Sequence, residues 1–391
     1  MFDVHAITRK NRRNFLAAAA MALLAGCAVV PKAPTAAPPP PPRPKPADSA
    51  IPVDKERHRI ALLVPLSGSN AGVGQSIANA ANMALMDTAA KDLRLTTYDT
   101  STDAADAARR AIADGNTLIL GPLLADDVPA VSAVAKGAKV PVISFSNDQA
   151  AASRDVFIMG NLPGESVSRT VAYARTRGIT TFAALVPRGD YGQRTSSALL
   201  AAVRDAGGSV VAMEPYDRSA VSLKAAVAKI KAKDGYGALL IADGGSLSAR
   251  AATQFRTGGS RPAVRLLGTE LWSGERELTT TPALKGAWFA TVSDNRFAQF
   301  SKSYRNRFGA APFRIATLGY DAVLLTLRVA RDWKPGKAFP AAQIVDSSGF
   351  LGLDGPFRFG RDGLVERSLE VREVETGAVT VVSAAPAKFE D

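Results

Sequence analysis

The chain has very few of the side chains that enzymes use most often as nucleophiles, bases or soft metal ligands. Among 391 residues there is one cysteine, Cys27, and there are two histidines, His5 and His58. Ser-His-Asp and Cys-His arrangements, and zinc sites built on these ligands, are therefore excluded from everything after residue 58. A single cysteine also excludes an intramolecular disulfide. Carboxylate chemistry, Ser-Lys pairs and oxygen-ligated metals remain open.

Long apolar runs and phosphate-binding loops are also missing. No segment after the N-terminal region reaches the 18 or so consecutive apolar residues of a membrane-spanning helix. The Walker-type phosphate loop is absent, and Ile77 stands where a dinucleotide loop starting at Gly72 needs its third glycine. About half of the formal net charge of +12 lies in the first 59 residues, and the other arginines are scattered. We therefore expect no cofactor and no nucleic-acid partner.

The first 27 residues have the order of a secretion signal. A basic cluster at 9–13 precedes a short apolar run at 15–24 and the small residues before Cys27. The block 24–27, Leu-Ala-Gly-Cys, resembles a lipobox, in which the cysteine is acylated and becomes the new N-terminus. We predict a lipoprotein signal peptide at 1–26 and lipidation at Cys27. A plain export signal with a chance cysteine is the alternative.

Two further details concern the export route and the destination. Arg12 and Arg13 followed by Phe15 and Leu16 resemble a twin-arginine signal, with the general secretory route as the alternative. Ala28 follows the cysteine, whereas in lipoproteins an aspartate there favours the inner membrane. We therefore expect a lipid-anchored envelope protein, at the outer membrane and facing the periplasm.

A proline-rich stretch separates this signal from the rest of the chain. Residues 31–46 are mostly proline, which fixes φ and removes N–H donors, so they cannot join a helix or a sheet. We assign 27–58 to the lipidated cysteine and a semi-rigid linker. Such a linker lets an anchored domain reach a partner, or it is an inert spacer.

From residue 60 onward, short apolar runs alternate with helical segments of 10–15 residues, a pattern that predicts βαβ units. The expected strands are 60–64, 117–120, 140–145, 156–159, 182–186, 210–214, 238–242, 264–267 and 287–292. The expected helices between them are 76–88, 103–113, 127–136, 165–177, 196–206, 223–233 and 246–257. There are too many strands for one sheet of ordinary size, so we predict an α/β fold of two doubly wound parallel-sheet lobes.

The last hundred residues break this alternation. Residues 295–308 and 316–331 predict two consecutive helices, and 357–359, 364–374 and 378–382 predict antiparallel strands. An ending of this kind suggests segments that cross back between the two lobes.

Several short motifs, taken in order, resemble type I periplasmic binding proteins. They are Val-Pro-Leu-Ser-Gly at 64–68, the glycine-rich turn at 72–76, the strand and turn at 141–147, Asp-Tyr-Gly at 190–192 and Leu-Gly-Tyr-Asp-Ala at 318–322. The resemblance implies a ligand cleft between two lobes. We expect residues 59–162 and 293–346 in the first lobe, and 163–292 and 347–391 in the second.

Two segments are similar to a subgroup, the penicillin-binding protein activators. They are Gly-Thr-Glu-Leu-Trp at 268–272 and the tail from 350 to 357. The first hypothesis is therefore a lipoprotein that activates a class A penicillin-binding protein in peptidoglycan synthesis by direct contact, without catalysis. The best-known activators carry an extra helical-repeat domain, which this chain replaces with its linker. The alternative is a solute receptor that delivers an amino acid or similar polar ligand to an ABC importer permease.

The resemblance also indicates which residues would face a functional cleft. From the first lobe these are Ser67, Gly68, Ser144, Ser146 and Asn147, and from the second they are Tyr191, Asp243 and Glu270. Hydroxyls and turn N–H groups suit a carboxylate, and Asp243 or Glu270 would suit an ammonium group. Turn formation is the alternative role of each serine. Glu270, which follows a strand, is the strongest candidate.

Overall fold

The computed structural model describes residues 57–258, 263–334, 336–386 and 389. The predicted signal peptide at 1–26, the lipidation site Cys27 and the predicted linker up to residue 56 lie outside the described residues. His58, which we assigned to the linker, is the first residue of strand β1. In the described part of the chain, no helix is long and apolar enough to cross a membrane.

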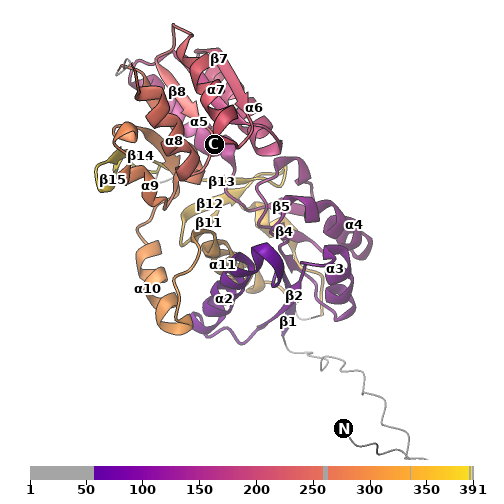
Figure 1. Ribbon diagram of the computed structural model, residues 1–391. Coiled ribbons are helices and arrows are strands. Elements are labelled where there is room, and N and C mark those ends of the chain that lie inside the picture. The colour runs from indigo at the N-terminus through magenta and orange to yellow at the C-terminus, as the bar shows by residue number, and fades with distance from the viewer. Residues whose placement is uncertain (1–56, 259–262, 335, 387–388, 390–391) are drawn as a thin grey trace, which may run out of the picture. The chain divides into compact units, whose positions relative to one another are not determined.

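The first lobe is built on a sheet of five parallel strands in the order β2-β1-β3-β4-β5. The strands are β1 (His58–Val64), β2 (Leu93–Asp99), β3 (Ile119–Leu120), β4 (Val142–Ser144) and β5 (Val156–Ile158). Residues 60–64 are completely buried, because helices cover both faces of the sheet. These helices include α2 (Ala71–Asp87), α3 (Ala104–Ala113) and α4 (Val128–Ala138), shown in indigo and purple in Figure 1.

The second lobe is built on a sheet of seven strands in the order β15-β14-β10-β9-β8-β6-β7. Five strands are parallel: β6 (Thr181–Pro187), β7 (Ser209–Tyr216), β8 (Ala238–Ile241), β9 (Arg265–Leu267) and β10 (Trp288–Thr291). Two antiparallel strands, β14 (Glu370–Glu375) and β15 (Ala378–Ser383), extend it. Its helices are α5 (Pro163–Thr176), α6 (Asp190–Asp205), α7 (Ala220–Lys231), α8 (Gly245–Arg256) and α9 (Arg276–Thr280). The predicted α/β fold with two parallel-sheet lobes is confirmed.

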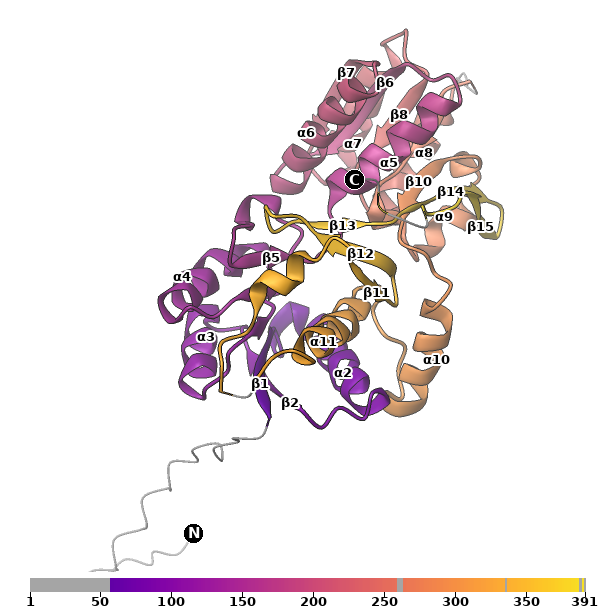
Figure 2. The ribbon, with the colours of Figure 1, turned by 180° about the vertical axis from the view of Figure 1, so that it is seen from behind.

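The segment after the second lobe's parallel strands returns to the first lobe (Figure 2). It forms α10 (Phe297–Phe308), α11 (Thr317–Ala330) and a small antiparallel sheet of β11 (Phe350–Gly352), β12 (Gly355–Phe359) and β13 (Val365–Arg367). Helix α11 packs along α2, and the aromatic side chains of α10 pack on Ala80 and Met83 of α2.

This return differs from the expected lobe boundary. We placed residues 347–391 in the second lobe, whereas Phe350, Phe357, Phe359 and Val365 belong to the hydrophobic core of the first lobe. The chain joins the second sheet only at β14. The predicted strand 364–374 is therefore two strands, β13 and β14, in different sheets. The apolar pattern could not show this break, because both strands carry buried side chains on either side of it.

The edge strand β2 was also absent from the predicted strands. Its sequence, Leu-Arg-Leu-Thr-Thr-Tyr-Asp, contains only two fully buried side chains, Leu93 and Tyr98. An edge strand pairs on one side only, so it needs no continuous apolar run.

A glycine occupies the same place in both lobes, where the helix that follows the first strand starts against the end of that strand. A Cβ atom on Gly74 of α2 would lie 1.8 Å from the carbonyl oxygen of Pro65, and one on Gly192 of α6 would lie 1.6 Å from that of Pro187. Only glycine permits this close approach between helix and strand. Each glycine sets the start of a helix next to the carboxyl ends of the strands, where a ligand site is expected in α/β sheets.

Candidate functional site

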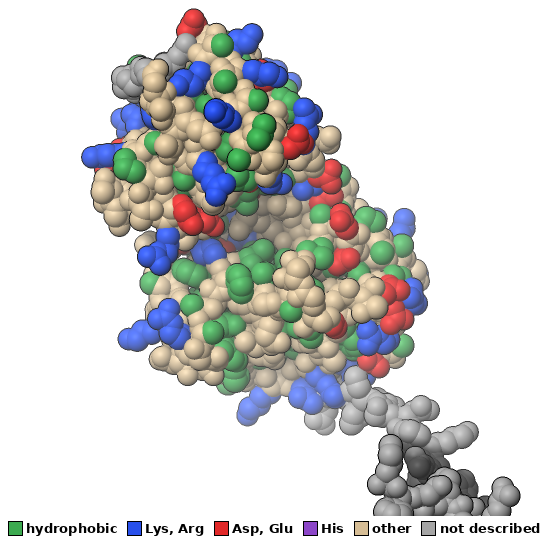
Figure 3. All heavy atoms as spheres, viewed as in Figure 1, with side chains coloured by type: hydrophobic (Ala, Val, Ile, Leu, Met, Phe, Trp, Pro, Cys, Tyr) green, Lys and Arg blue, Asp and Glu red, His purple; other side chains and the backbone are tan. Residues whose placement is uncertain are grey.

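A cleft with a volume of about 460 Å³ is lined by residues of both lobes. The space-filling view shows the surface hollowed between the two lobes (Figure 3). Most of the lining is apolar: Leu123, Leu124, Ala125, Phe145 and Ile315 from the first lobe, and Leu271 and Val292 from the second. The polar lining residues are Asn147, Asn161, Glu270, Ser273 and Arg314.

Glu270 reaches the cleft because of the turn that follows β9. Gly268 directly follows the strand, and the indole of Trp272 fills the space where a Cβ of residue 268 would lie, 2.1 Å from the nearest ring atom. Trp272 is completely buried, and its Nε1 donates to the carbonyl oxygen of Asp243 and to the hydroxyl of Ser248. This anchor fixes the short helical turn Glu270–Trp272 and directs Glu270 into the cleft.

The carboxyl group of Glu270 is supported from behind by Tyr191. The Tyr191 hydroxyl donates to Glu270 Oε1 at 3.0 Å and shares a 2.8 Å hydrogen bond with Thr269 Oγ1. Burial raises the pKa of Glu270 to about 7, although the bonds from its own backbone N–H and from Tyr191 act in the opposite direction. Near neutral pH, Glu270 can therefore act as an acceptor or as a donor.

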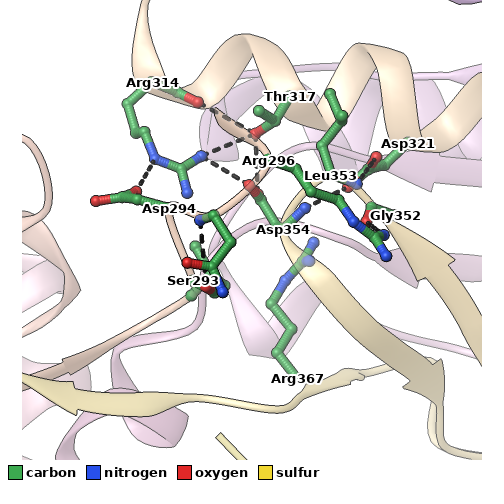
Figure 4. A network of polar contacts seen from close by, with 12 residues as sticks. Ser293, Asp294, Arg296, Arg314, Thr317, Asp321, Gly352, Leu353, Asp354 and Arg367 are labelled. Atoms are coloured by element: carbon green, nitrogen blue, oxygen red, sulfur yellow. Dashed lines mark hydrogen bonds and ion pairs between the residues drawn. The ribbon is translucent and has the colours of Figure 1, made fainter. Parts of the chain in front are cut away.

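Arg314 supplies the cation of the cleft, from the turn Arg314–Ala316 that precedes α11 (Figure 4). Its Nη1 donates to Asp354 Oδ1 at 2.7 Å, its Nε lies 3.3 Å from Asp294 Oδ1, and its guanidinium stacks over the ring of Phe297. Burial alone would lower the pKa of Arg314, but the charges of Asp354 and Asp294 outweigh it and raise the pKa. Arg314 therefore stays a cation.

Five polar atoms of the lining residues are buried without a hydrogen-bond partner. They are Asn161 Oδ1, Glu270 Oε2, Ser273 Oγ, and Nε and Nη2 of Arg314, of which Nε faces Asp294. A buried polar group without a partner costs about 1–3 kcal/mol. The apolar cleft is thus lined by one residue with an unpartnered cationic donor on the first lobe, and by residues with unpartnered acceptors on the second lobe and on the crossover at 161.

Three of the residues expected at the cleft are close together. Asn147 and Glu270 line it directly, and Tyr191 touches Glu270 without being part of the lining.

The other expected residues have local partners. The Ser144 hydroxyl donates to the carbonyl oxygen of Pro122, and the Ser146 hydroxyl accepts from the N–H of Asp148, so both serines serve the turn. Ser67, which is exposed together with Gly68, donates to Asp99. Asp243 is buried and accepts from the hydroxyl of Tyr216 and from Arg218. None of these residues is part of the cleft lining.

Arg314, Asn161 and Ser273 were not among the cleft residues predicted from the sequence. Arg314 is one of many scattered arginines, and nothing in its neighbourhood in the sequence marks it as buried. The only available clue was position, because 314 directly precedes a predicted helix and 161 lies at the predicted boundary between the lobes. Within the described residues, no cluster of three or more His, Cys, Asp or Glu side chains could hold a metal ion.

Comparison with known proteins identifies relatives of this fold. A family model described as "Periplasmic binding protein" matches residues 58–378. A solved structure of a putative branched-chain amino acid ABC transporter protein from Rhodospirillum rubrum is 22% identical with a TM-score of 0.74, and covers 83% of this chain and 100% of its own. The leucine-binding protein LivK of Thermotoga maritima is 19% identical with a TM-score of 0.65, and covers 84% and 98%.

A third structure is the solute-binding protein of an ABC transporter from Rhodopseudomonas palustris, in complex with 3,4-dihydroxybenzoic acid. It is 20% identical with a TM-score of 0.65, and covers 86% of this chain and 98% of its own. At these identities the likeness shows the fold. Among curated proteins, an uncharacterized protein of Rickettsia prowazekii is 27% identical over 179 residues, which is 45% of this chain and 48% of that protein. The chain thus spans about half the length of the curated relative it matches.

Proposed function

Because the chain belongs to the periplasmic binding protein family, we propose that it is a solute receptor that holds a small, largely apolar ligand between its lobes without transforming it. One observation carries the proposal. Residues that line an otherwise apolar cleft carry five buried polar atoms without hydrogen-bond partners, and these residues come from both lobes and from a crossover between them. A ligand that supplied their missing partners would hold the lobes together.

The chemistry of these atoms defines the ligand. Arg314 Nη2 can only donate, so it requires an acceptor such as a carboxylate. Asn161 Oδ1 can only accept, and an ionised Glu270 can only accept, so they require an ammonium, hydroxyl or amide N–H group. An apolar amino acid carries a carboxylate, a donor group and an apolar side chain. A hydroxylated aromatic acid likewise carries a carboxylate and donor hydroxyls on an apolar ring. The solved relatives named above for leucine and for 3,4-dihydroxybenzoic acid support this choice.

Two features separate this proposal from the activator hypothesis. The segments that suggested an activator have local roles, since Trp272 packs on Gly268 and the tail from Phe350 to Phe357 packs into the core of the first lobe. The three solved structures named above are solute-binding or transporter proteins, which favours the importer alternative. The partner we propose is therefore the permease of an ABC importer.

Calorimetric titration of the purified protein tests the receptor function. L-Leucine and 3,4-dihydroxybenzoate are the probes, and at least one should bind and raise the melting temperature, since a ligand at 100 times its Kd adds about 2.7 kcal/mol. Glu270→Gln and Arg314→Gln should each weaken binding at least tenfold. Glu214→Gln removes a carboxylate of the second lobe that pairs with Lys229 away from the cleft, and should leave binding unchanged. A wild-type protein that binds neither probe, yet co-purifies with a penicillin-binding protein, would restore the activator hypothesis.

We propose that the protein works in the periplasm, anchored through a lipid on Cys27. Replacement by Cys27→Ser should release the protein from the membrane fraction into the periplasmic extract. Separation of the inner and outer membranes then tests the predicted outer-membrane location. Recovery of the protein with the inner membrane, where an importer permease lies, would contradict that prediction.

A further inference from the structure

Arg314 lines the cleft and lies next to Asp294, which belongs to the crossover through which the chain returns from β10 to α10 (Figure 4). Each side of its guanidinium has a different environment. Nη1 is bound to Asp354, Nε faces Asp294 of the crossover, and Nη2 belongs to a cleft residue and has no partner. A ligand carboxylate at Nη2 would therefore share the cation with two carboxylates of the protein.

The two carboxylates differ in how firmly they hold the cation. The Asp354 side chain is 1% exposed, and it also accepts from the hydroxyl of Thr317 at 2.9 Å. The Asp294 side chain is 43% exposed, and its 3.3 Å approach to Arg314 Nε lacks hydrogen-bond geometry, so Oδ1 has no hydrogen-bond partner. Asp354 is thus the permanent partner of Arg314, while the attraction of Asp294 is electrostatic and partly screened.

The charge of Asp294 is nevertheless fixed in place from its other side. Arg372 of β14, which is buried, contacts Asp294 Oδ2 through Nη1 and donates through Nη2 to the carbonyl oxygen of Val292 at 3.0 Å. Val292 is a lining residue of the cleft. Asp294 therefore cannot swing away when a second anion approaches Arg314, and its negative charge remains next to the cleft.

We propose that Asp294 is a specificity-determining residue, which lowers the affinity of the cleft for ligands that present a carboxylate to Arg314, by competing for the charge of Arg314. The proposal rests on the proposed function, because it needs a ligand in the cleft. Asp294 partly neutralises Arg314 and repels a ligand carboxylate, but it has little effect on a neutral ligand group at the same position. Asp294 therefore reduces the preference of the cleft for a carboxylate over a neutral acceptor at Arg314.

The test compares carboxylate ligands with their amides in the full-length chain. Asp294→Asn keeps the shape of the side chain and removes its charge. Binding of L-leucine and L-leucinamide, and of 3,4-dihydroxybenzoate and 3,4-dihydroxybenzamide, is measured by calorimetry. The variant should bind the carboxylates about threefold more tightly, the size expected for a half-exposed charge, and bind the amides as the wild type does. The gain should shrink in 1 M salt, which screens exposed charges.

Asp346→Asn is the matched control. Asp346 is 44% exposed and pairs with Arg328 away from the cleft lining, so its removal changes the net charge equally and should change no affinity. Equal changes for carboxylate and amide in Asp294→Asn would indicate a structural role of Asp294 and overturn the inference. Weaker carboxylate binding would also overturn it, because Asp294 would then be orienting Arg314. A wild-type protein that binds none of the four compounds would instead refute the proposed function, and the inference with it.

Discussion

The hydroxyl of Tyr191 donates to Oε1 of Glu270 at 3.0 Å, across a separation of 79 residues. Tyr191 belongs to the first turn of α6, and Glu270 to the turn after β9. The bond occupies one carboxylate oxygen and leaves the other, which is buried without a partner, for the cleft. The pairing makes Tyr191 a positioning residue for the strongest candidate ligand contact.

Removing this hydroxyl should change the pH dependence of binding. Glu270 has a pKa of about 7, and the bond from Tyr191 lowers that pKa. Tyr191→Phe should therefore raise it, so that the carboxylate needed for an ammonium group forms only at higher pH. L-Leucine affinity measured between pH 6 and 9 should rise with pH, with its midpoint shifted upward in the variant. Tyr173→Phe, which removes a hydroxyl bonded to Arg177, should leave the midpoint unchanged, and an unshifted midpoint in Tyr191→Phe would contradict the assignment.

The two glycines at the helix starts should be among the least replaceable positions. Gly74→Ala and Gly192→Ala each force a methyl group into a carbonyl oxygen, and overpacking of this kind costs about 1–3 kcal/mol or more. Gly137→Ala in α4 adds a methyl group where no atom lies within 4 Å, and it should be neutral or slightly stabilising. Urea unfolding of the three variants measures the difference. Equal stability of all three would show that the helix starts can shift without cost.

His58 should contribute an acid-sensitive part of the stability. Burial lowers its pKa from 6.5, and its ring stacks on Trp333 with centroids 3.8 Å apart. The unfolded chain therefore takes up a proton below pH 6.5 more readily than the native protein, so stability falls as the pH drops below 6.5. His58→Phe keeps a stacked ring without a titrating group.

The buried carboxyl groups change the folding stability with pH in the opposite direction to His58. The pKa values of Glu165, Glu270 and Asp321 are raised, in each case mainly by burial, so their contribution to stability decreases as the pH rises from about 4 to 8. The contribution of His58 is therefore isolated by comparing the pH dependence of the free energy of unfolding in the wild type and in His58→Phe. Chemical unfolding should show that the free energy of unfolding falls more between pH 7.5 and pH 5.5 in the wild type than in the variant. An equal fall in both proteins would contradict a buried, neutral His58.

Breaking the pair between Arg314 and Asp354 should destabilise the protein strongly. Asp354→Asn leaves Arg314, whose side chain is only 17% exposed, without its buried counter-charge. Removal of one partner of a buried pair costs about 3–5 kcal/mol. Asp346→Asn breaks a half-exposed pair with Arg328 and should cost less than about 1 kcal/mol. Thermal unfolding compares the stability of the two variants. Similar melting temperatures would show that Asp294 alone is enough to compensate the charge of Arg314.

Local patterns were enough to predict the fold class and most of its elements. Buried parallel strands such as 60–64 have continuous apolar sequences, and amphipathic helices alternate with them, so both are visible along the chain. The edge strand β2 and the division between β13 and β14 were missed, because each depends on what the strand pairs with and not on its own composition.

The sequence by itself determined the scarcity of histidine and cysteine, the two-lobed α/β plan, and Glu270 as a candidate for the cleft, since each follows from composition or from a short segment. Only the tertiary structure decided which polar atoms are left without partners. The hydroxyls of Ser144 and Ser146 form hydrogen bonds within their own turn. Arg314 and Asn161, which no sequence motif marks, line the same cleft as Glu270. The reason is physical: whether a polar atom finds a hydrogen-bond partner depends on neighbours such as Tyr191, which lies 79 residues from Glu270, and no local pattern records them.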